Sequence, residues 1–233
     1  YGQILTQDVL DSFQMGAFHV QDISSMLVTH LANPKDGDVV IDVCAAPGGK
    51  SLHMAELLGG TGHVEARDLT DYKVNLIWDN IQRSGMQNIE AVRWDATILD
   101  ETSVEKADIV VADLPCSGLG VLGKKTDLKY KMTEQTQSDL VELQRDILSK
   151  VKAYVKPGGT LIYSTCTIHE AENMGNVDWF LSKNTEFELV SVKEDLCEEL
   201  RESVVRDGCL QLIPGVHKSD GFFIAKFKKV KHE

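Results

Sequence analysis

Two cysteines stand in settings that suit chemistry rather than packing. Cys116 lies in the segment DLPCSGLG, three residues after Asp113, and Cys166 lies in YSTCTIHEAEN. Thiolates are strong nucleophiles, and two adjacent thiols could also serve as a reversible redox pair. A cysteine is most often a small apolar filler of the core, but the Pro, Ser, Gly and Thr neighbours of these two argue against that role. We expect the filler role only for Cys197 and Cys209.

A run of small residues, CAAPGGK, has the features of a ligand-binding loop. It follows a β-branched run and precedes a helical pattern, and its members are Cys44, Ala45, Ala46, Pro47, Gly48, Gly49 and Lys50. Small side chains let a ligand approach the backbone, and the first N–H groups of the next helix attract a carboxylate or a phosphate. The spacing is neither the GxGxxG of a dinucleotide site nor the GxxxxGK[ST] of a nucleoside triphosphate site. A turn that serves only packing is the alternative.

Acidic residues end three of the predicted strands, namely Asp68, Asp95 and Asp113. In a doubly wound sheet, ligands bind beyond the carboxyl ends of the strands, where an acidic residue can hold ribose hydroxyls. Asp68 or Asp71 could instead cap the helix that follows. Three acidic strand ends beside a loop without phosphate spacing favour an adenosyl group that carries an amino-acid tail. S-adenosylmethionine fits this description.

Strand and helix patterns alternate along the chain, and this alternation predicts the fold. Short apolar runs predict strands at residues 38–45, 62–68, 89–96, 107–115, 159–166, 187–192 and 221–229. Helical periodicity predicts helices at residues 50–58, 71–85 and 134–155, after a helical lead-in over residues 1–35. Such a chain forms an α/β, Rossmann-like, doubly wound sheet that is mostly parallel, here with a late antiparallel strand. If the strands that end near Asp113 and Cys166 are neighbours, both thiols open onto one cleft.

The composition limits the class of protein. A chain of 233 residues with 42% hydrophobic content suffices for one α/β core. The sequence has neither an apolar run of membrane-spanning length nor a signal peptide, so we expect a soluble, cytoplasmic protein. The number of cysteines is odd and no CxxC pair occurs, which argues against a disulfide framework and against a metal site.

The charge balance opposes a nucleic-acid partner at long range. Acidic residues outnumber basic ones by 36 to 24, which gives a net charge of −12. The basic residues are bunched at 123–131 and at 226–231, where they either contact phosphates or form solvated segments. Because the sequence begins at Tyr1 rather than at Met, we expect either a fragment or a longer chain with a disordered start, and a function that depends on the missing residues.

Five segments together resemble the Sun/Nol1/Nop2 family of RNA cytosine-5 methyltransferases. They are GAFHVQDISSMLV, DVCAAPGGK, DLPCSGLG, YSTCTIHEAEN and DGFFIAKF, and they run in the family's order from Gly16 to Phe227. Within the family, the sequence is most similar to the bacterial members that methylate a cytosine of 16S ribosomal RNA. The resemblance implies that residues 36–233 form an S-adenosylmethionine-dependent methyltransferase domain and that RNA is the substrate.

The resemblance also assigns roles to the residues noted above. It implies that the CAAPGGK loop binds the cofactor, that Asp68 holds its ribose and that Asp95 lies by its adenine. It further implies that Asp113 sits between the cofactor and the target base, and that Cys166 is the nucleophile. The chain departs from the family pattern at Leu114, where alanine is more frequent, and in LGKKTDLKY, where lysines replace an arginine-rich segment.

The chemistry of the reaction accounts for two cysteines. Carbon 5 of cytosine is a poor nucleophile, and a thiolate that adds to carbon 6 converts the ring into an enamine, which can take a methyl group at carbon 5. A base must then remove the proton from carbon 5, and Cys116 is placed to assist this release.

Other functions stay open at this point. A DNA cytosine methyltransferase would use Cys116 as the nucleophile. Transfer RNA could replace ribosomal RNA as the substrate, and the chain could be a catalytically silent RNA-binding module. A redox pair has no use for the CAAPGGK loop. The acidic charge leads us to expect that a missing N-terminal RNA-binding region or a ribosomal partner supplies positive surface.

Overall fold

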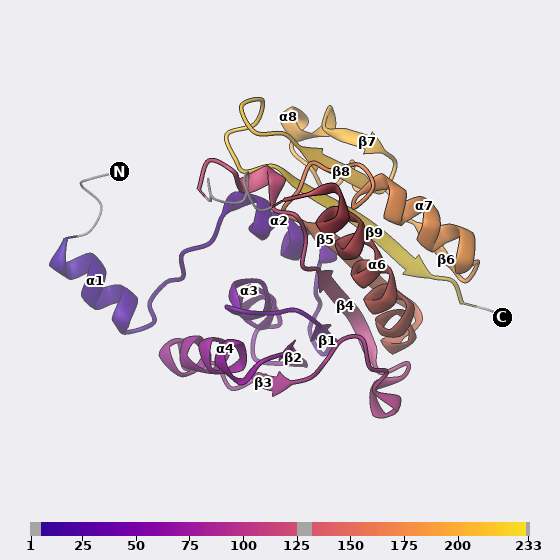
Figure 1. Cartoon of the computed structure of the whole chain (residues 1–233). Coiled ribbons are helices and arrows are strands. Elements are labelled where there is room, and N and C mark those ends of the chain that lie inside the picture. The colour runs from indigo at the N-terminus through magenta and orange to yellow at the C-terminus, as the bar shows by residue number, and fades with distance from the viewer. Residues whose placement is uncertain (1–5, 125–131, 232–233) are drawn as a thin grey trace.

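A nine-stranded sheet forms the centre of the computed structural model, which describes residues 6–124 and 132–231 (Figure 1). The parallel strands are β1 (Val39–Asp42), β2 (His63–Asp68), β3 (Ile89–Arg93), β4 (Ala107–Asp113) and β5 (Val155–Thr165). The antiparallel strands are β6 (Phe187–Leu189), β7 (Val204–Arg206), β8 (Cys209–Leu212) and β9 (Phe222–Lys229).

The strand order is β3-β2-β1-β4-β5-β9-β8-β7, and β6 pairs with β9. The chain therefore reverses direction across the sheet between β1 and β4, the place where doubly wound folds bind ligands. The predicted fold class is confirmed, including the late antiparallel strand, which is β9. The sequence did not predict β7 and β8, which extend the sheet beyond β9.

Helices cover both faces of the sheet (Figure 1). Their bounds are α1 (Gln7–Gln14), α2 (Ile23–Ala32), α3 (Gly49–Leu57), α4 (Asp71–Ser84), α6 (Glu134–Val151), α7 (Met174–Lys183) and α8 (Glu198–Arg201). Successive strand residues point to opposite faces. Val40 therefore packs in one core with residues of α2, α3 and α4, while Ile41 packs in a second core with residues of α6 and α7.

The ends of the helices follow from local sequence. Thr70 caps α4 by accepting a hydrogen bond from the Lys73 N–H, and Gly85 ends this helix with a φ of 69°. The helix cap is thus Thr70, so the alternative that Asp68 or Asp71 fills this position is wrong. The helix predicted to reach residue 155 ends at Val151, because a 3-10 turn at 152–154 leads into β5.

The lead-in is packed against α4 by one arginine. Nη1 of Arg83 donates to the carbonyl oxygens of Phe13 (2.9 Å) and Phe18 (3.2 Å), and the guanidinium lies 4.0 Å from the centre of the Phe13 ring. Gly16 lies at this contact with a φ of 77°, and a Cβ there would come within 1.9 Å of the Arg83 carbonyl oxygen. Only glycine fits this close approach of two backbones.

The structure also tests two expectations from the sequence, the burial of Cys197 and Cys209 and the lack of a membrane-spanning segment. Cys209 is buried as predicted, but Cys197 is exposed, because it lies at the N-terminus of the short surface helix α8. The filler role is therefore wrong for Cys197. Across residues 6–124 and 132–231, the helices are too short or too polar to cross a bilayer.

Candidate active site at the carboxyl ends of the strands

The CAAPGGK loop joins β1 to α3 and leaves the helix N-terminus open. Gly48 precedes α3 with a φ of 103° and has no side chain to cap the helix. A Cβ on Gly48 would lie 3.3 Å from a methyl carbon of Ile77, so α4 packs closely against the loop. The first N–H groups of α3 have no partner within the helix and suit an anionic group such as a carboxylate.

Asp68 ties the end of β2 to this loop. Its side chain is almost fully buried, and Oδ2 accepts a hydrogen bond from the Ala46 N–H at 3.0 Å. Oδ1 accepts from the Leu69 N–H at 2.8 Å and lies 3.1 Å from Nζ of Lys73. A carboxylate fixed this way at a strand end has the position expected of a ribose-binding residue.

Asp95 follows β3 and is oriented by its own turn. Its Oδ1 accepts from the N–H and from the hydroxyl of Thr97, at 2.9 and 2.7 Å, and these bonds lower the pKa of Asp95. The preceding Trp94 N–H donates to the Asp68 carbonyl oxygen at 3.0 Å, which brings the ends of β2 and β3 together. The two predicted nucleoside contacts therefore lie on adjacent strand ends.

A cavity of about 170 Å³ lies between the loop and the lead-in. It is lined by Val20, Gln21, Asp22, Ser25, Asp42, Cys44, Ala45, Ala46, Pro47, Gly49, Lys50 and Asp113. Asp42 is fully buried, and burial raises its pKa to about 6. Its Oδ2 accepts from the Ser51 hydroxyl, whereas Oδ1 has no partner among the described residues. An open helix N-terminus for a carboxylate and a buried oxygen for an ammonium group both fit the amino-acid end of S-adenosylmethionine.

Lys50 and Asp113 form an ion pair at the wall of this cavity. The Lys50 Nζ lies 2.5 Å from Oδ2 of Asp113, and the Ser164 hydroxyl donates to Oδ1 at 2.8 Å. Burial alone would lower the pKa of Lys50, but the Asp113 carboxylate more than offsets this and raises it. Lys50 therefore stays protonated beside the Asp113 carboxylate, next to the cofactor loop.

The two cysteines lie side by side at the ends of β4 and β5. These strands are parallel neighbours, with Asp113 opposite Ser164. The condition set in the sequence analysis, that the two strands be adjacent, is therefore met. The Sγ atoms of Cys116 and Cys166 are 3.2 Å apart, and the Cys166 N–H points at the Cys116 sulfur at 3.3 Å. The hydrogen bond to Cys166, followed by burial, raises the pKa of Cys116. The structure thus brings together Asp113, Cys116 and Cys166, the three residues predicted to be catalytic.

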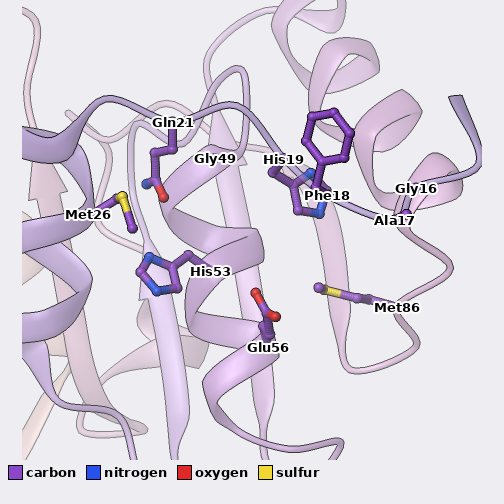
Figure 2. Close-up of a pocket in the computed structure, with 10 residues that line it drawn as sticks. All are labelled: Gly16, Ala17, Phe18, His19, Gln21, Met26, Gly49, His53, Glu56 and Met86. Atoms are coloured by element: carbon purple, nitrogen blue, oxygen red, sulfur yellow. The ribbon is translucent and has the colours of Figure 1, made fainter. Parts of the chain in front are cut away.

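The sequence analysis missed the part that the lead-in plays. A second cavity of about 310 Å³ lies under residues 16–19 and shares Gln21 and Gly49 with the first (Figure 2). Nε2 of Gln21 and Nδ1 of His53 are buried there and lack a partner in the described part of the chain. The only signal in the sequence was the segment GAFHVQDISSMLV, which entered the prediction through the resemblance alone.

Two lysines of the segments 123–131 and 226–231 illustrate how these basic residues pair with acidic side chains. Nζ of Lys124 lies 2.9 Å from Asp22 and 2.6 Å from Asp220, and these hydrogen bonds raise the pKa of Lys124. Nζ of Lys229 lies 2.8 Å from Glu105. Residues 125–131 of the first cluster lie outside the described residues. Lys124, Lys226 and Lys229 are thus paired with acidic side chains, whereas Lys228 and Lys231 are exposed.

The sheet order, the loop after β1 and the acidic strand ends define the class of the protein, which has the fold of the S-adenosylmethionine-dependent methyltransferases. The sequence profile of the 16S rRNA methyltransferase RsmB/F family matches residues 29–228. The chain belongs to this family. The resemblance found in the sequence is confirmed.

Individual relatives agree with the family assignment. The chain is 42% identical, over 93% of its length, to the probable ribosomal RNA small subunit methyltransferase B of Bacillus subtilis, and covers 49% of that protein. It is 34% identical, over 95% of its length, to the tRNA (cytosine(72)-C(5))-methyltransferase of Pyrococcus horikoshii, and covers 55% of it. The crystal structure of NSun6 from Pyrococcus horikoshii with SFG matches with a TM-score of 0.84 and 31% identity, over 98% of this chain and 57% of that one. The chain spans about half the length of the curated relatives it matches.

Proposed function

We propose that the protein is an RNA methyltransferase that converts a cytosine to 5-methylcytosine through a covalent bond between Cys166 and carbon 6 of the base. One observation carries the proposal. The sulfurs of Cys116 and Cys166 lie 3.2 Å apart, directly beyond the strand end where Asp113 pairs with Lys50 of the cofactor loop. A nucleophile, a second thiol and the Lys50–Asp113 ion pair therefore surround one place next to the cofactor.

The loop and the acidic strand ends would hold the cofactor. We assign binding to residues 44–50, ribose contacts to Asp68 and adenine contacts to Asp95, with Asp113 between the cofactor and the base. Bound S-adenosylmethionine supplies an electrophilic methyl group. The chain's own residues must orient the base and make its carbon 5 nucleophilic.

The attack begins with the Cys166 thiolate. Its sulfur forms a bond to carbon 6 of cytosine, and the electrons of the 5,6 double bond shift into the ring. The Lys50 ammonium, which is held by Asp113, stabilises the negative charge that develops towards ring nitrogen 3. Carbon 5 then has enamine character and accepts the methyl group.

Release of the product needs a base, and Cys116 is placed to supply it. The pKa of Cys116 is raised first by its hydrogen bond to Cys166, and this bond is lost once Cys166 is bonded to the base. Cys116 then gives up its proton to solvent, and the Gly118 N–H, which points at the same sulfur, stabilises the resulting thiolate. This thiolate removes the proton from carbon 5, the double bond re-forms, and Cys166 leaves as a thiolate.

We place the substrate in 16S ribosomal RNA. The support is the family profile, together with the 42% identity to the probable ribosomal RNA small subunit methyltransferase B of Bacillus subtilis. The similarity to a tRNA (cytosine(72)-C(5))-methyltransferase keeps transfer RNA as the second candidate. A ribosomal substrate would place the protein in the cytoplasm, and the base must leave its stack to reach the strand ends.

The negative net charge of the chain bears on how it would bind RNA. With a net charge of −12, the chain gains little from long-range attraction to RNA. We propose that a region outside this sequence, or a ribosomal partner, supplies the positive surface. We also retain the division into a lead-in at 1–35 and a catalytic domain at 36–233, although Asp22 of the lead-in contributes to the cofactor cavity.

The test uses the purified protein and S-adenosylmethionine with a labelled methyl group. Unmodified 16S ribosomal RNA, transfer RNA and a DNA duplex are offered in separate reactions, and the modified base is identified by nucleoside analysis. We expect labelled 5-methylcytosine in 16S RNA and none with the Cys166→Ala variant. Label in transfer RNA alone would move the substrate, and label in DNA alone would contradict an RNA enzyme. If neither this chain nor a longer one that includes its upstream region methylates any of them, the proposal is wrong.

A further inference from the structure

We propose that Glu172 and Asn173 are positioning residues, each of which fixes the backbone on both sides of one cysteine. The two residues are consecutive in the loop between β5 and α7, and both are almost completely buried. Glu172 acts on the Cys116 segment and Asn173 acts on the Cys166 segment. The geometric part of the inference is independent of the reaction, and only the catalytic consequences rest on the proposed function.

Glu172 holds the peptide that follows Cys116. Its Oε2 accepts a hydrogen bond from the Ser117 N–H at 2.9 Å and from Nε2 of Gln144 at 2.8 Å. The same Gln144 Nε2 donates to the carbonyl oxygen of Pro115 at 2.8 Å. The residues immediately before and after Cys116 are therefore tied to one buried carboxylate, directly or through Gln144. Charge-assisted bonds of this kind are stronger than neutral ones and define direction well.

Asn173 does the same for Cys166. Its Oδ1 accepts from the Thr165 hydroxyl at 2.6 Å, and its Nδ2 donates to the Thr167 carbonyl oxygen at 3.0 Å. One amide side chain thus bridges the residues on either side of Cys166. A second bond from Nδ2, to Oε1 of Gln211 at 2.8 Å, fixes the amide orientation from β8.

A cross-link joins the two segments. The hydroxyls of Ser117 and Thr167, the residues that follow the two cysteines, are 2.7 Å apart and fully buried. The other oxygen of Glu172, Oε1, lies 3.3 Å from Nδ1 of His169. The loop that contains Glu172 and Asn173 therefore holds both cysteine segments in one frame, and this frame sets the distance between the two sulfurs.

This arrangement has a mechanistic consequence. Nucleophilic attack and proton removal act on adjacent carbons of one ring, so each sulfur must be held to within a fraction of an ångström. Loss of Glu172 should mainly disturb Cys116 and the release step. Loss of Asn173 should mainly disturb Cys166 and the attack.

The first experiment measures the geometry without any RNA. The reduced protein is treated with diamide, which takes up two hydrogens as the Cys116 and Cys166 thiols join in a disulfide. The linked peptide is quantified over time by mass spectrometry. We expect rapid formation in the wild type and formation about ten-fold slower in Glu172→Ala and Asn173→Ala.

Three variants separate positioning from a general loss of stability. Glu172→Gln keeps an oxygen that can accept both hydrogen bonds, and it should retain nearly the wild-type rate. Asn173→Asp keeps the acceptor for Thr165 but lacks the donor to Thr167, and it should be intermediate. Asn184→Ala removes a buried side chain whose one hydrogen bond among the described residues goes to the Phe180 carbonyl oxygen, and it should leave the rate unchanged.

The second experiment uses RNA and labelled S-adenosylmethionine. Glu172→Ala should accumulate the covalent RNA adduct, and Asn173→Ala should form it slowly, with the affinity for the cofactor unchanged in both. Equal disulfide rates in all variants would overturn the inference, as would a wild type that forms no disulfide. If the wild type forms the disulfide but neither it nor the longer chain with its upstream region methylates RNA, the proposed function fails while the geometric result stands.

Discussion

The Sγ atoms of Cys116 and Cys166 lie 3.2 Å apart although the two residues are 50 positions apart in the sequence. The parallel pairing of β4 with β5 creates this contact, because each cysteine follows the carboxyl end of its strand. The two sulfurs are not equivalent. The sulfur of Cys116 accepts hydrogen bonds from the N–H groups of Gly118 and Cys166. Such bonds suit a group that must later become a thiolate and accept a proton.

The two cysteines should therefore fail in different ways when replaced. In Cys166→Ala, no bond to carbon 6 can form, so both methylation and the covalent RNA adduct should vanish. In Cys116→Ala, attack and methyl transfer remain but proton removal is slow, so a methylated adduct should accumulate. Denaturing electrophoresis with labelled RNA shows the adduct as a band that migrates slowly.

The opposite pattern would change the assignment. An adduct trapped in Cys166→Ala and absent in Cys116→Ala would make Cys116 the nucleophile, as in the DNA-type mechanism. Full activity in both variants would rule out a covalent cysteine mechanism.

Asp68→Ala should weaken binding of S-adenosylmethionine. The variant loses the charge-assisted bonds predicted to the ribose and also the bond that holds the Ala46 N–H. We expect a loss of about 1.5 to 3 kcal/mol, or roughly ten- to a hundred-fold in affinity, measured by calorimetry. Asp71→Ala is the matched control, because Asp71 is exposed and pairs with Arg93 on the surface. An equal loss in both variants would remove Asp68 from the cofactor site.

Asp42→Asn should stabilise the fold in a manner that depends on pH. Burial raises the pKa of Asp42 from 3.8 to about 6, so the unfolded chain ionises at lower pH than the folded one. The folded wild type therefore loses stability as the pH rises from 3.8 to 6, by about 3 kcal/mol, and the loss is constant above that window. Asparagine does not ionise and can still accept the Ser51 hydrogen bond.

The measurement is the free energy of unfolding of both proteins in urea. The difference in favour of Asp42→Asn should be near zero around pH 3 and reach its full size by about pH 7. A difference that stays the same at every pH would mean that ionisation of Asp42 does not oppose folding.

Gly16→Ala should loosen the contact between the lead-in and α4. The new Cβ would lie 1.9 Å from the Arg83 carbonyl oxygen, and the φ of 77° is unfavourable for alanine. Gly37→Ala is the control, because Gly37 has a φ of 86° with no atom within 4 Å of the added Cβ. Both variants should lose about 1 kcal/mol from backbone strain, and Gly16→Ala should lose about 1 to 3 kcal/mol more from the clash.

Limited proteolysis supplies a second readout for this contact. Cleavage near residues 15–21 should accelerate in Gly16→Ala and remain at the wild-type rate in Gly37→Ala. Equal stability and equal cleavage in the two variants would show that the lead-in tolerates a shift of its backbone.

Local patterns were sufficient to predict the main elements. β2 and β4 begin at the predicted residues, within one position, and α4 ends before Gly85 as its sequence requires. These features depend on apolar periodicity and on glycine, which act within a few residues. The strands β7 and β8 are short and lack a strong pattern, and they are held in the sheet by pairing, β7 with β8 and β8 with β9.

The sequence by itself determined the class of fold, the loop that suits the cofactor and the residue types that could react, because each of these is written in short segments. Only the tertiary structure decided their relationships. It placed the Asp113 carboxylate against Lys50, the two sulfurs in contact, and Glu172 and Asn173 beside the segments of the cysteines. Such contacts join residues that no local pattern connects, and they exist because the strands align their carboxyl ends at one edge of the sheet and the buried polar groups there must find partners.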